Sequence, residues 1–283
     1  MQAYLDCYPC VLRQSIEAAR MAGATPTQER EIVIEALRIL QSLPENSTPP
    51  EISMHVHRAT REITGNPDPY FQAKAESTRK AMGLMPRLRE VLAEADDPLE
   101  AAVRLSIAGN IMDFGPNPQF DLWEVVQRVL EQPISLNDLD AFREKLSMVE
   151  RELYLADNAG ETVFDRLLIE TLSPEVTYVV KGGPVLNDAT HEDATAAGID
   201  QVAEVVDNGT QITGTILDLC SLDFQERFEQ AELIISKGMG NYETLSTVPG
   251  PIFFLMQVKC PVIGIDIGVP KGSIVVKQGL ETQ

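Results

Sequence analysis

Side chains with oxygen donors stand directly after two apolar segments that read as buried strands. Asp157 and Asn158 follow the run Leu153–Ala156. Asp188 comes shortly after the next run, Val176–Val180. Because ligands bind outside the carboxyl ends of the strands in an open parallel sheet, we expect these three side chains to meet there. Carboxylate and amide oxygens suit Mg²⁺ or Mn²⁺, so the pattern predicts a divalent-cation site, although Asp and Asn also cap helices.

Lysines and glycines at strand ends add features that a phosphate group requires. Lys181 stands at the end of the second run, and Lys237 follows a third run, Leu233–Ile235. Gly238 and Gly240 come next. Backbone N–H groups exposed in such a loop cradle a phosphate, and a lysine adds charge. The spacing matches neither a Walker A loop nor a dinucleotide-binding G-x-G-x-x-G fingerprint.

The composition excludes several classes of partner. The chain has 283 residues, is 44% hydrophobic and carries a net charge of −20, which fits a globular protein. This charge argues against nucleic acid and anionic membranes as partners. An anionic substrate therefore needs local positive charge from a cation, lysines or helix N-termini. No segment has the length of a membrane span, and the N-terminus has no signal-peptide pattern, so we predict a cytoplasmic location.

The two halves of the chain differ in hydrophobic periodicity. Residues 1–148 read as helices, with start signals at Thr25-Pro26 and Thr48-Pro49. Residues 149–283 alternate short β-branched runs with helical patterns, which indicates βαβ units. The predicted fold is α/β and Rossmann-like, with a mostly parallel sheet, helices on both faces, and an all-helical N-terminal region. The predicted domains are a helical domain, 1–148, and an α/β metal-binding domain, 149–283.

The elements expected in the second half can be stated by range. The strands are Leu153–Ala156, Val176–Val180, Val202–Val206, Leu233–Ile235, Ile252–Leu255, Val262–Ile265 and Ile274–Val276. The helices are Val163–Leu172, Ala189–Ala197, Ile212–Leu219 and Phe224–Ala231. Because the last two strands follow each other closely, we expect an antiparallel strand at the edge of the sheet.

Other candidate residues carry weaker signals. Cys7 and Cys10 form a C-x-x-C without a second close ligand pair, so we interpret them as helix-start residues and leave zinc or redox roles open. His55 and His57 lie two apart on an expected helix and face different directions, which does not suit a shared metal. The Gly109-Asn110 pair has the pattern of an ordinary helix C-cap.

Taken together, the loops resemble the damage-control phosphatase family, once catalogued as domain of unknown function 89, and in particular its shorter microbial type. The residues that carry the resemblance span nearly the whole chain in order. They are Cys7-Tyr8-Pro9-Cys10, Asp68-Pro69-Tyr70, Gly109-Asn110-x-x-Asp113, Asp157-Asn158-Ala159-Gly160-Glu161, Lys181-Gly182-x-Pro184-x-x-Asn187-Asp188-x-Thr190 and Ser236-Lys237-Gly238-Met239-Gly240-Asn241-Tyr242-Glu243. Each motif alone is weak, whereas the ordered set is specific.

The resemblance implies a phosphatase that depends on a divalent cation (Mn²⁺, Co²⁺, Ni²⁺ or Mg²⁺) and hydrolyses small phosphorylated metabolites such as sugar phosphates. The family's metal ligands, which are also the implied catalytic residues, fall on Asp157, Asn158 and Asp188. The implied substrate-binding residues are Asn110, Asp113, Lys181, Asn187, Lys237, Gly238, Gly240 and Asn241. The attacking group stays open between water and an aspartate.

Two other function classes stay open on the residues alone. An acidic residue after a strand, such as Asp157 or Asp207, is also found in S-adenosylmethionine-dependent methyltransferases. The same loops would equally serve a non-catalytic protein that binds a metal or a nucleotide. The oligomeric state cannot be read from the sequence.

Overall fold

A mixed sheet occupies the centre of the protein. The computed structural model describes residues 1–44, 46–110 and 122–281, and in these the strand order is β1-β7-β6-β5-β2-β3-β4. All neighbouring strands are parallel except β6 and β7. The strands are β1 (Ile134–Asn137), β2 (Arg151–Leu155), β3 (Glu175–Val180), β4 (Glu204–Asp207), β5 (Ile234–Lys237), β6 (Ile252–Gln257) and β7 (Ile274–Gln278). The predicted Rossmann-like α/β class is confirmed.

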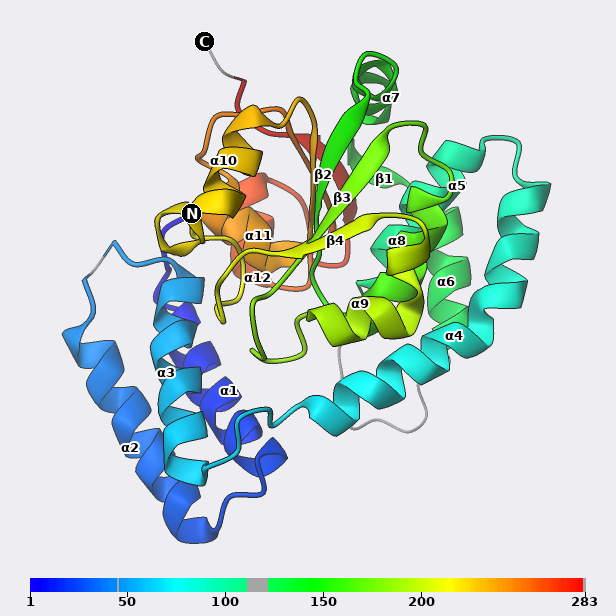
Figure 1. Cartoon of the computed structure of the whole chain (residues 1–283). Helices are drawn as coiled ribbons and strands as arrows, with labels where there is room; N and C mark the ends of the chain where they lie inside the picture. Colours follow the sequence, from blue (N-terminus) through cyan, green and yellow to red (C-terminus); the bar gives the residue numbers. More distant parts are fainter. Residues whose placement is uncertain (45, 111–121, 282–283) are drawn as a thin grey trace.

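Helices cover both faces of the sheet (Figure 1). On one face, α4, α5, α6, α7, α8 and α9 share the larger apolar core with the sheet, and on the other face α10, α11 and α12 share the second core. Burial on both faces explains why β5 and β6 read as continuous apolar runs. Their bounds are α4 (Phe71–Glu94), α5 (Pro98–Gly109), α6 (Leu122–Glu131), α7 (Leu139–Leu146), α8 (Thr162–Ile169), α9 (His191–Ala197), α10 (Leu222–Gln230), α11 (Gly238–Leu245) and α12 (Pro261–Ile267).

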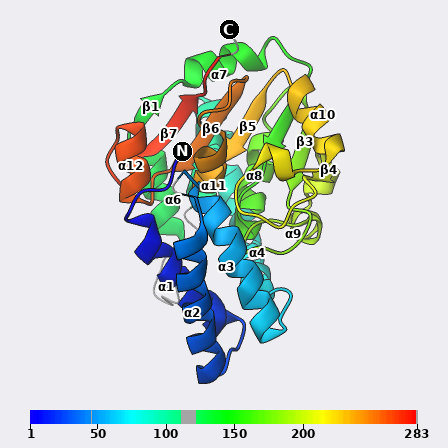
Figure 2. The same cartoon turned by 90° about the vertical axis from the view of Figure 1, so that its left-hand side faces the viewer.

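The first three helices form a unit that projects away from the sheet (Figure 2). They are α1 (Cys7–Met21), α2 (Pro26–Ser42) and α3 (Pro49–Thr64). The predicted start signals are confirmed, because Thr25 and Thr48 each form a capping box with a proline in the first turn. This unit has a small core of its own, made of Val11, Ala36, Ile52 and Val56. Since α4–α7 instead pack on the sheet, the division of the chain at residue 148 stays a prediction.

Three expectations about elements are wrong, each for a physical reason. The N-terminal region is not all-helical, because β1 lies within it; its four residues are too few to give a periodic signal. The antiparallel pair is β6–β7, and β1 rather than β7 occupies the edge. The run Val262–Ile265 lies in helix α12, which Pro261 opens and Gly268 closes with a φ of 81°.

The segment 212–219 is also not the helix that was expected. Only a short 3₁₀ turn, Leu217–Leu219, forms there, and Gly214 adopts a φ of 69°, which interrupts any helix. Within the described ranges, no helix combines the length and the apolar character needed to cross a membrane.

Candidate active site

The loops that follow β2 and β3 are joined to each other by backbone pairing. Asn158 and Asp188 form an isolated antiparallel bridge between the two loops. The Ala189 N–H donates to the Asp157 carbonyl at 2.8 Å and reinforces the bridge. As a result, the predicted ligands come together at the carboxyl edge of the sheet, where β2 and β3 end.

Two amide groups hold the carboxylate of Asp157. Its Oδ2 accepts a hydrogen bond from Asn110 Nδ2 at 2.7 Å and another from Asn158 Nδ2 at 2.7 Å. Both amides also donate to Glu161 Oε2, at 2.9 and 3.1 Å. Asn110 is the C-cap of α5, as its sequence context predicted, and it also faces the site. The side chains of Asn110, Asn158 and Glu161 therefore fix the orientation of Asp157.

The glycines after β5 allow backbone segments to approach one another. A Cβ added at Gly238 would lie 2.0 Å from Asp157 Oδ2, and the φ of Gly238 is 76°. Gly240 packs against a second glycine, because a Cβ at Gly214 would lie 2.3 Å from the Gly240 carbonyl oxygen. This loop was predicted to cradle a phosphate, but the group that lies against Gly238 is the carboxylate of Asp157.

Lys237 lies beneath the site and does not line it. Its side chain is 0% exposed, and Nζ donates to the Ser106 carbonyl at 3.1 Å, to Glu161, and to Asp165 Oδ1 at 2.6 Å. Burial lowers the pKa of Lys237, but the carboxylates of Asp165 and Glu161 outweigh this effect and leave the pKa above its ordinary value. Lys237 is therefore charged, and three protein oxygens accept hydrogen bonds from its ammonium group. The prediction that Lys237 contacts a phosphate directly does not fit these surroundings.

Asp165 is the centre of the buried network around Lys237. Its carboxylate also accepts hydrogen bonds from Ser106 Oγ at 3.0 Å, Tyr154 Oη at 2.8 Å and Tyr178 Oη at 2.7 Å. Burial and the negative charge of Asp165 raise the pKa of both tyrosines well above the ordinary value, so they act as donors. Sequence analysis did not identify Asp165. The available signal was its spacing of four residues from Glu161, because this spacing puts both side chains on one helical face.

Two other predicted residues also have structural partners. Lys181 Nζ donates to the Gly214 carbonyl and lies 3.6 Å from Asp188 Oδ2, so its charge acts on the second carboxylate of the site. Asn241 Nδ2 donates to the Ala156 carbonyl at 3.1 Å, and its Oδ1 accepts from Thr215 Oγ1 at 2.8 Å. Asn241 therefore ties α11 to the end of β2.

A cavity of about 240 Å³ opens between this edge of the sheet and the α1–α3 unit. The predicted site residues that line it are Asn110, Asp157, Asn158, Asn187, Asp188 and Gly240. The wall contributed by the α1–α3 unit includes Cys7, Cys10, Gln14 and Ser53. The predicted residues Lys181, Lys237, Gly238 and Asn241 are not among its lining residues. Asp113 lies outside the described residues.

The chemistry of this cavity wall fits a hard divalent cation. Asp157 and Asp188 supply carboxylates, and Asn158 supplies an amide, all of which are ligands that Mg²⁺ and Mn²⁺ accept. Asn110 Oδ1 is a further buried oxygen, and no hydrogen-bond donor among the described residues contacts it. A buried amide oxygen without a donor is costly unless a cation or water satisfies it.

Comparison with known proteins decides the family. The chain matches the damage-control phosphatase ARMT1-like domain over residues 3–275. The chain belongs to this family. A damage-control phosphatase of Pyrococcus horikoshii is 35% identical over 283 residues, which cover 97% of each chain. One of Archaeoglobus fulgidus is 34% identical over 284 residues, which cover 96% of this chain and 97% of the relative.

A solved structure supports the same assignment within the damage-control phosphatase family. The crystal structure of a DUF89 family protein from Pyrococcus horikoshii superposes with a TM-score of 0.90 at 33% identity, covering 99% of both chains. An uncharacterized protein of Methanocaldococcus jannaschii is 34% identical over 284 residues, which cover 95% of this chain and 92% of the relative. The family resemblance inferred from the loops is confirmed.

Sequence analysis of this family member missed three charged residues that line the cavity, Asp6, Glu243 and Lys259. Lys259 follows the end of β6, and Glu243 lies on α11. The expected strand Ile252–Leu255 ends four residues before Lys259, so the position of Lys259 after a strand was the available signal. Burial, together with the charge of Asp266, raises the pKa of Glu243 to about 7, although the N-terminal amino group of Met1 opposes this shift.

The cysteines and histidines have different surroundings. Cys7, Cys10 and Cys260 all line the cavity, and burial raises the pKa of the Cys7 thiol. The described part of the chain holds no group of three or more His, Cys, Asp or Glu side chains arranged for a metal ion. His57 is buried, which lowers its pKa to about 4, whereas His55 is partly exposed. Helix α1 begins at Cys7, as the interpretation of Cys7 and Cys10 as helix-start residues expects, and the zinc and redox alternatives stay open.

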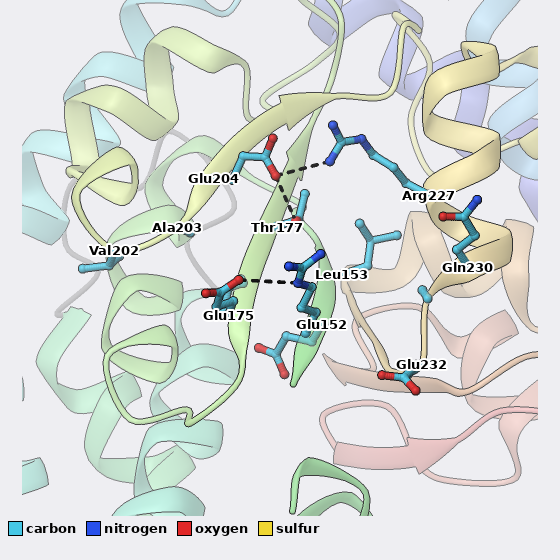
Figure 3. Close-up of a pocket in the computed structure, with 13 residues that line it drawn as sticks. Glu152, Leu153, Glu175, Thr177, Val202, Ala203, Glu204, Arg227, Gln230 and Glu232 are labelled. Carbon is cyan, nitrogen blue, oxygen red and sulfur yellow. Dashed lines mark hydrogen bonds and ion pairs between the residues drawn. The ribbon is translucent and has the colours of Figure 1, made fainter. Parts of the chain in front are cut away.

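A larger cavity, of about 690 Å³, lies at the opposite edge of the sheet, where β2, β3 and β4 begin (Figure 3). Charged side chains around it form exposed ion pairs, Arg151–Glu175 at 3.5 Å and Arg227–Glu204 at 3.2 Å. Glu152 is different, because its carboxyl group is buried without a hydrogen-bond partner among the described residues. Since ligands of such sheets bind at the carboxyl edge, the smaller cavity is the candidate active site.

Proposed function

We propose that this protein is a metal-dependent phosphatase that hydrolyses small phosphorylated metabolites, such as sugar phosphates or damaged phosphometabolites. One observation carries the proposal: pairing between the loops after β2 and β3 puts Asp157, Asn158 and Asp188 on one wall of a cavity. The names of the relatives from Pyrococcus horikoshii and Archaeoglobus fulgidus support the phosphatase activity.

Asp157, Asn158 and Asp188 would hold the divalent cation, and Mn²⁺, Co²⁺, Ni²⁺ and Mg²⁺ are the candidates. A bound cation would supply a Lewis acid that offsets negative charge on the phosphoryl oxygens. The surrounding residues hold the ligand side chains in place before a substrate binds. The amides of Asn110 and Asn158 orient Asp157, and the ammonium group of Lys181 lies 3.6 Å from Asp188 Oδ2. Such preorganisation removes the need to reorganise the site during the reaction.

The buried network of Glu161, Asp165 and Lys237 supports the site from below. Lys237 donates to both carboxylates, and Glu161 in turn accepts from the amides of Asn110 and Asn158. A continuous set of hydrogen bonds therefore runs from the sheet interior to Asp157. We assign Lys237 to positioning these amides.

The size of the cavity limits the substrate. Its volume of about 240 Å³ is below the roughly 300–1,000 Å³ that is usual for drug-sized ligands. Polar residues from the α1–α3 unit, among them Asp6 and Gln14, face the same space and can bind hydroxyl groups. A small, hydroxylated phosphomonoester suits this space better than a nucleoside triphosphate.

The proposal is tested by turnover of a chromogenic phosphomonoester. We expect the purified protein to hydrolyse it, to lose activity with a chelator and to regain it with Mn²⁺, Co²⁺ or Ni²⁺. The Asp157→Ala protein, prepared in parallel, should be slower by roughly 10²-fold or more, by analogy with the loss of one preorganised donor. Equal activity of the two preparations would indicate a contaminating phosphatase and refute the proposal. Absence of turnover with every phosphomonoester in the presence of each metal would favour a non-catalytic role.

A further inference from the structure

Two thiols that take no part in the proposed reaction line the candidate active-site cavity. Cys7 and Cys10 are both free cysteines on its wall. They come from one face of α1, whose later residues Val11 and Gln14 line the same cavity. The cavity is therefore bounded by a pair of thiols from the α1–α3 unit as well as by the proposed cation ligands at the edge of the sheet.

The positions of the two cysteines suit a disulfide between them. Cys7 is the first residue of α1, and Cys10 lies three residues later in the same turn. Residues three apart on a helix have Cβ atoms roughly 5–6 Å apart, whereas a disulfide needs about 3.5–4.5 Å, so the turn has to tighten by about 1–2 Å. No side-chain cap resists this change, because the N-cap residue Asp6 makes no capping hydrogen bond.

The surroundings of the two thiols give them different roles. Cys10 is partly exposed, and its Sγ accepts a hydrogen bond from Arg13 Nη2 at 3.6 Å, although Arg13 also lies 4.0 Å from Glu17. Cys7 is buried, and burial raises the pKa of its thiol. Since access decides which thiol an oxidant reaches first, Cys10 is the attacking thiol and Cys7 is the resolving thiol.

We propose that Cys7 and Cys10 form a reversible disulfide that lowers the activity of the enzyme, with a low-molecular-weight disulfide as the oxidant. The Cys10 thiolate attacks one sulfur of the oxidant, whose S–S bond breaks, and the departing thiolate takes up a proton. The Cys7 thiolate then attacks the Cys10 sulfur of this mixed disulfide and releases the second thiol. The two cysteines together lose two electrons and two protons, which the oxidant gains as it becomes two thiols.

Formation of this bond changes the cavity beside the proposed cation. Cys7, Cys10 and the preceding Asp6 all line the cavity, so a tighter first turn of α1 moves part of its wall. A displacement of about 1 Å close to the reacting groups can lower turnover by up to roughly 10²-fold. The effect on activity rests on the proposed phosphatase function, whereas formation of the disulfide does not.

A map of the thiols after oxidation tests the disulfide. The purified protein is treated with oxidised glutathione, its free thiols are alkylated, and it is cleaved with trypsin without reduction. We expect the peptide 1–13, which contains both cysteines and ends at Arg13, to carry no alkyl group and to lack two hydrogens. A bond from Cys7 or Cys10 to Cys260 would instead join two peptides and refute the proposal. Alkylation of both cysteines at every ratio of oxidised to reduced glutathione would refute it as well.

Three variants connect the disulfide with activity. In the wild type we expect oxidation to lower kcat/KM for a phosphomonoester by roughly 10- to 100-fold and dithiothreitol to restore it. Cys10→Ser should keep the activity of its own reduced form, and Cys7→Ser should retain glutathione bound to Cys10 because the resolving thiol is missing. Cys260→Ser is the matched control, since Cys260 lines the same cavity, and it should form the disulfide and lose activity as the wild type does.

The outcomes separate this disulfide from the proposed function. If the disulfide forms and the oxidised and reduced wild type turn over substrate equally fast, control of activity is refuted and the phosphatase function stands. Protection of activity by Cys260→Ser, without protection by Cys10→Ser, would also refute the proposal. If the reduced wild type turns over no phosphomonoester with any of the candidate metals, the phosphatase function is refuted, and control of activity with it, while the peptide map still decides whether the disulfide forms.

Discussion

Replacement of Gly238 by alanine should damage the metal site through contact with Asp157. The added Cβ would lie 2.0 Å from Asp157 Oδ2, whereas such contacts are essentially never shorter than 3.0 Å. The carboxylate must therefore move by about 1 Å (3.0 minus 2.0), or α11 must shift. A displacement of about 1 Å in a preorganised site can lower turnover by roughly 10²-fold. We expect Gly238→Ala to lose about this factor in kcat/KM and to bind Mn²⁺ more weakly.

The effect of backbone strain at residue 238 must be distinguished from the effect of the contact between the added Cβ and Asp157. Its φ of 76° costs an alanine about 1–2 kcal/mol, whatever lies nearby. Gly65 is the matched control, because its φ is 69° and an added Cβ would meet nothing within 4 Å. Gly65→Ala should lose a similar free energy of unfolding and keep wild-type turnover. The reasoning is refuted if Gly238→Ala, folded as judged by its denaturation curve, binds Mn²⁺ and turns over substrate as Gly65→Ala does.

Two predictions concern stability. Burial raises the pKa of Glu152 to about 8 from an ordinary value of 4.5, so the folded state binds this proton more tightly and loses stability as pH rises between these values. Glu152→Gln should therefore gain about 1.4 kcal/mol over the wild type for each pH unit across that window in urea denaturation, and a constant difference across the window would contradict the assignment. Lys237→Met should lower the free energy of unfolding by about 3–5 kcal/mol, because it leaves Glu161 and Asp165 buried without a cation; a loss below about 1 kcal/mol would contradict the network.

Local signals were sufficient to predict much of the fold. The capping boxes at Thr25 and Thr48 depend on residues three apart, so they are visible in the sequence. The apolar run Val262–Ile265 was misassigned because four residues fit a strand or a helix equally well, and the proline and glycine around it decided the outcome. The position of β1 in the sheet depends on pairing with β7, more than 130 residues away, which no local pattern encodes.

The sequence was sufficient to predict which residues of the candidate site follow strands. It was not sufficient where the contacts of a side chain depend on how deeply that side chain is buried. Asp157 and Asp188 follow β2 and β3, so the sheet geometry alone predicted that they would lie close. Lys237 also ends a strand, but its direction and burial depend on Glu161 and Asp165, which come from another part of the chain. A lysine at a strand end gives no sequence signal for the face to which it points.

Binding of Mn²⁺ to the purified protein tests most directly whether Asp157, Asn158 and Asp188 share one cation. In calorimetric titration of the metal-free protein, we expect one Mn²⁺ per chain, and an affinity lower by roughly 10²-fold or more for Asp157→Ala and for Asp188→Ala. Asp207→Ala is the control, because Asp207 also ends a strand but accepts a hydrogen bond from the Gly209 N–H at 2.8 Å within a turn. Wild-type affinity in Asp157→Ala and Asp188→Ala, equal to that of Asp207→Ala, would contradict the proposed metal site.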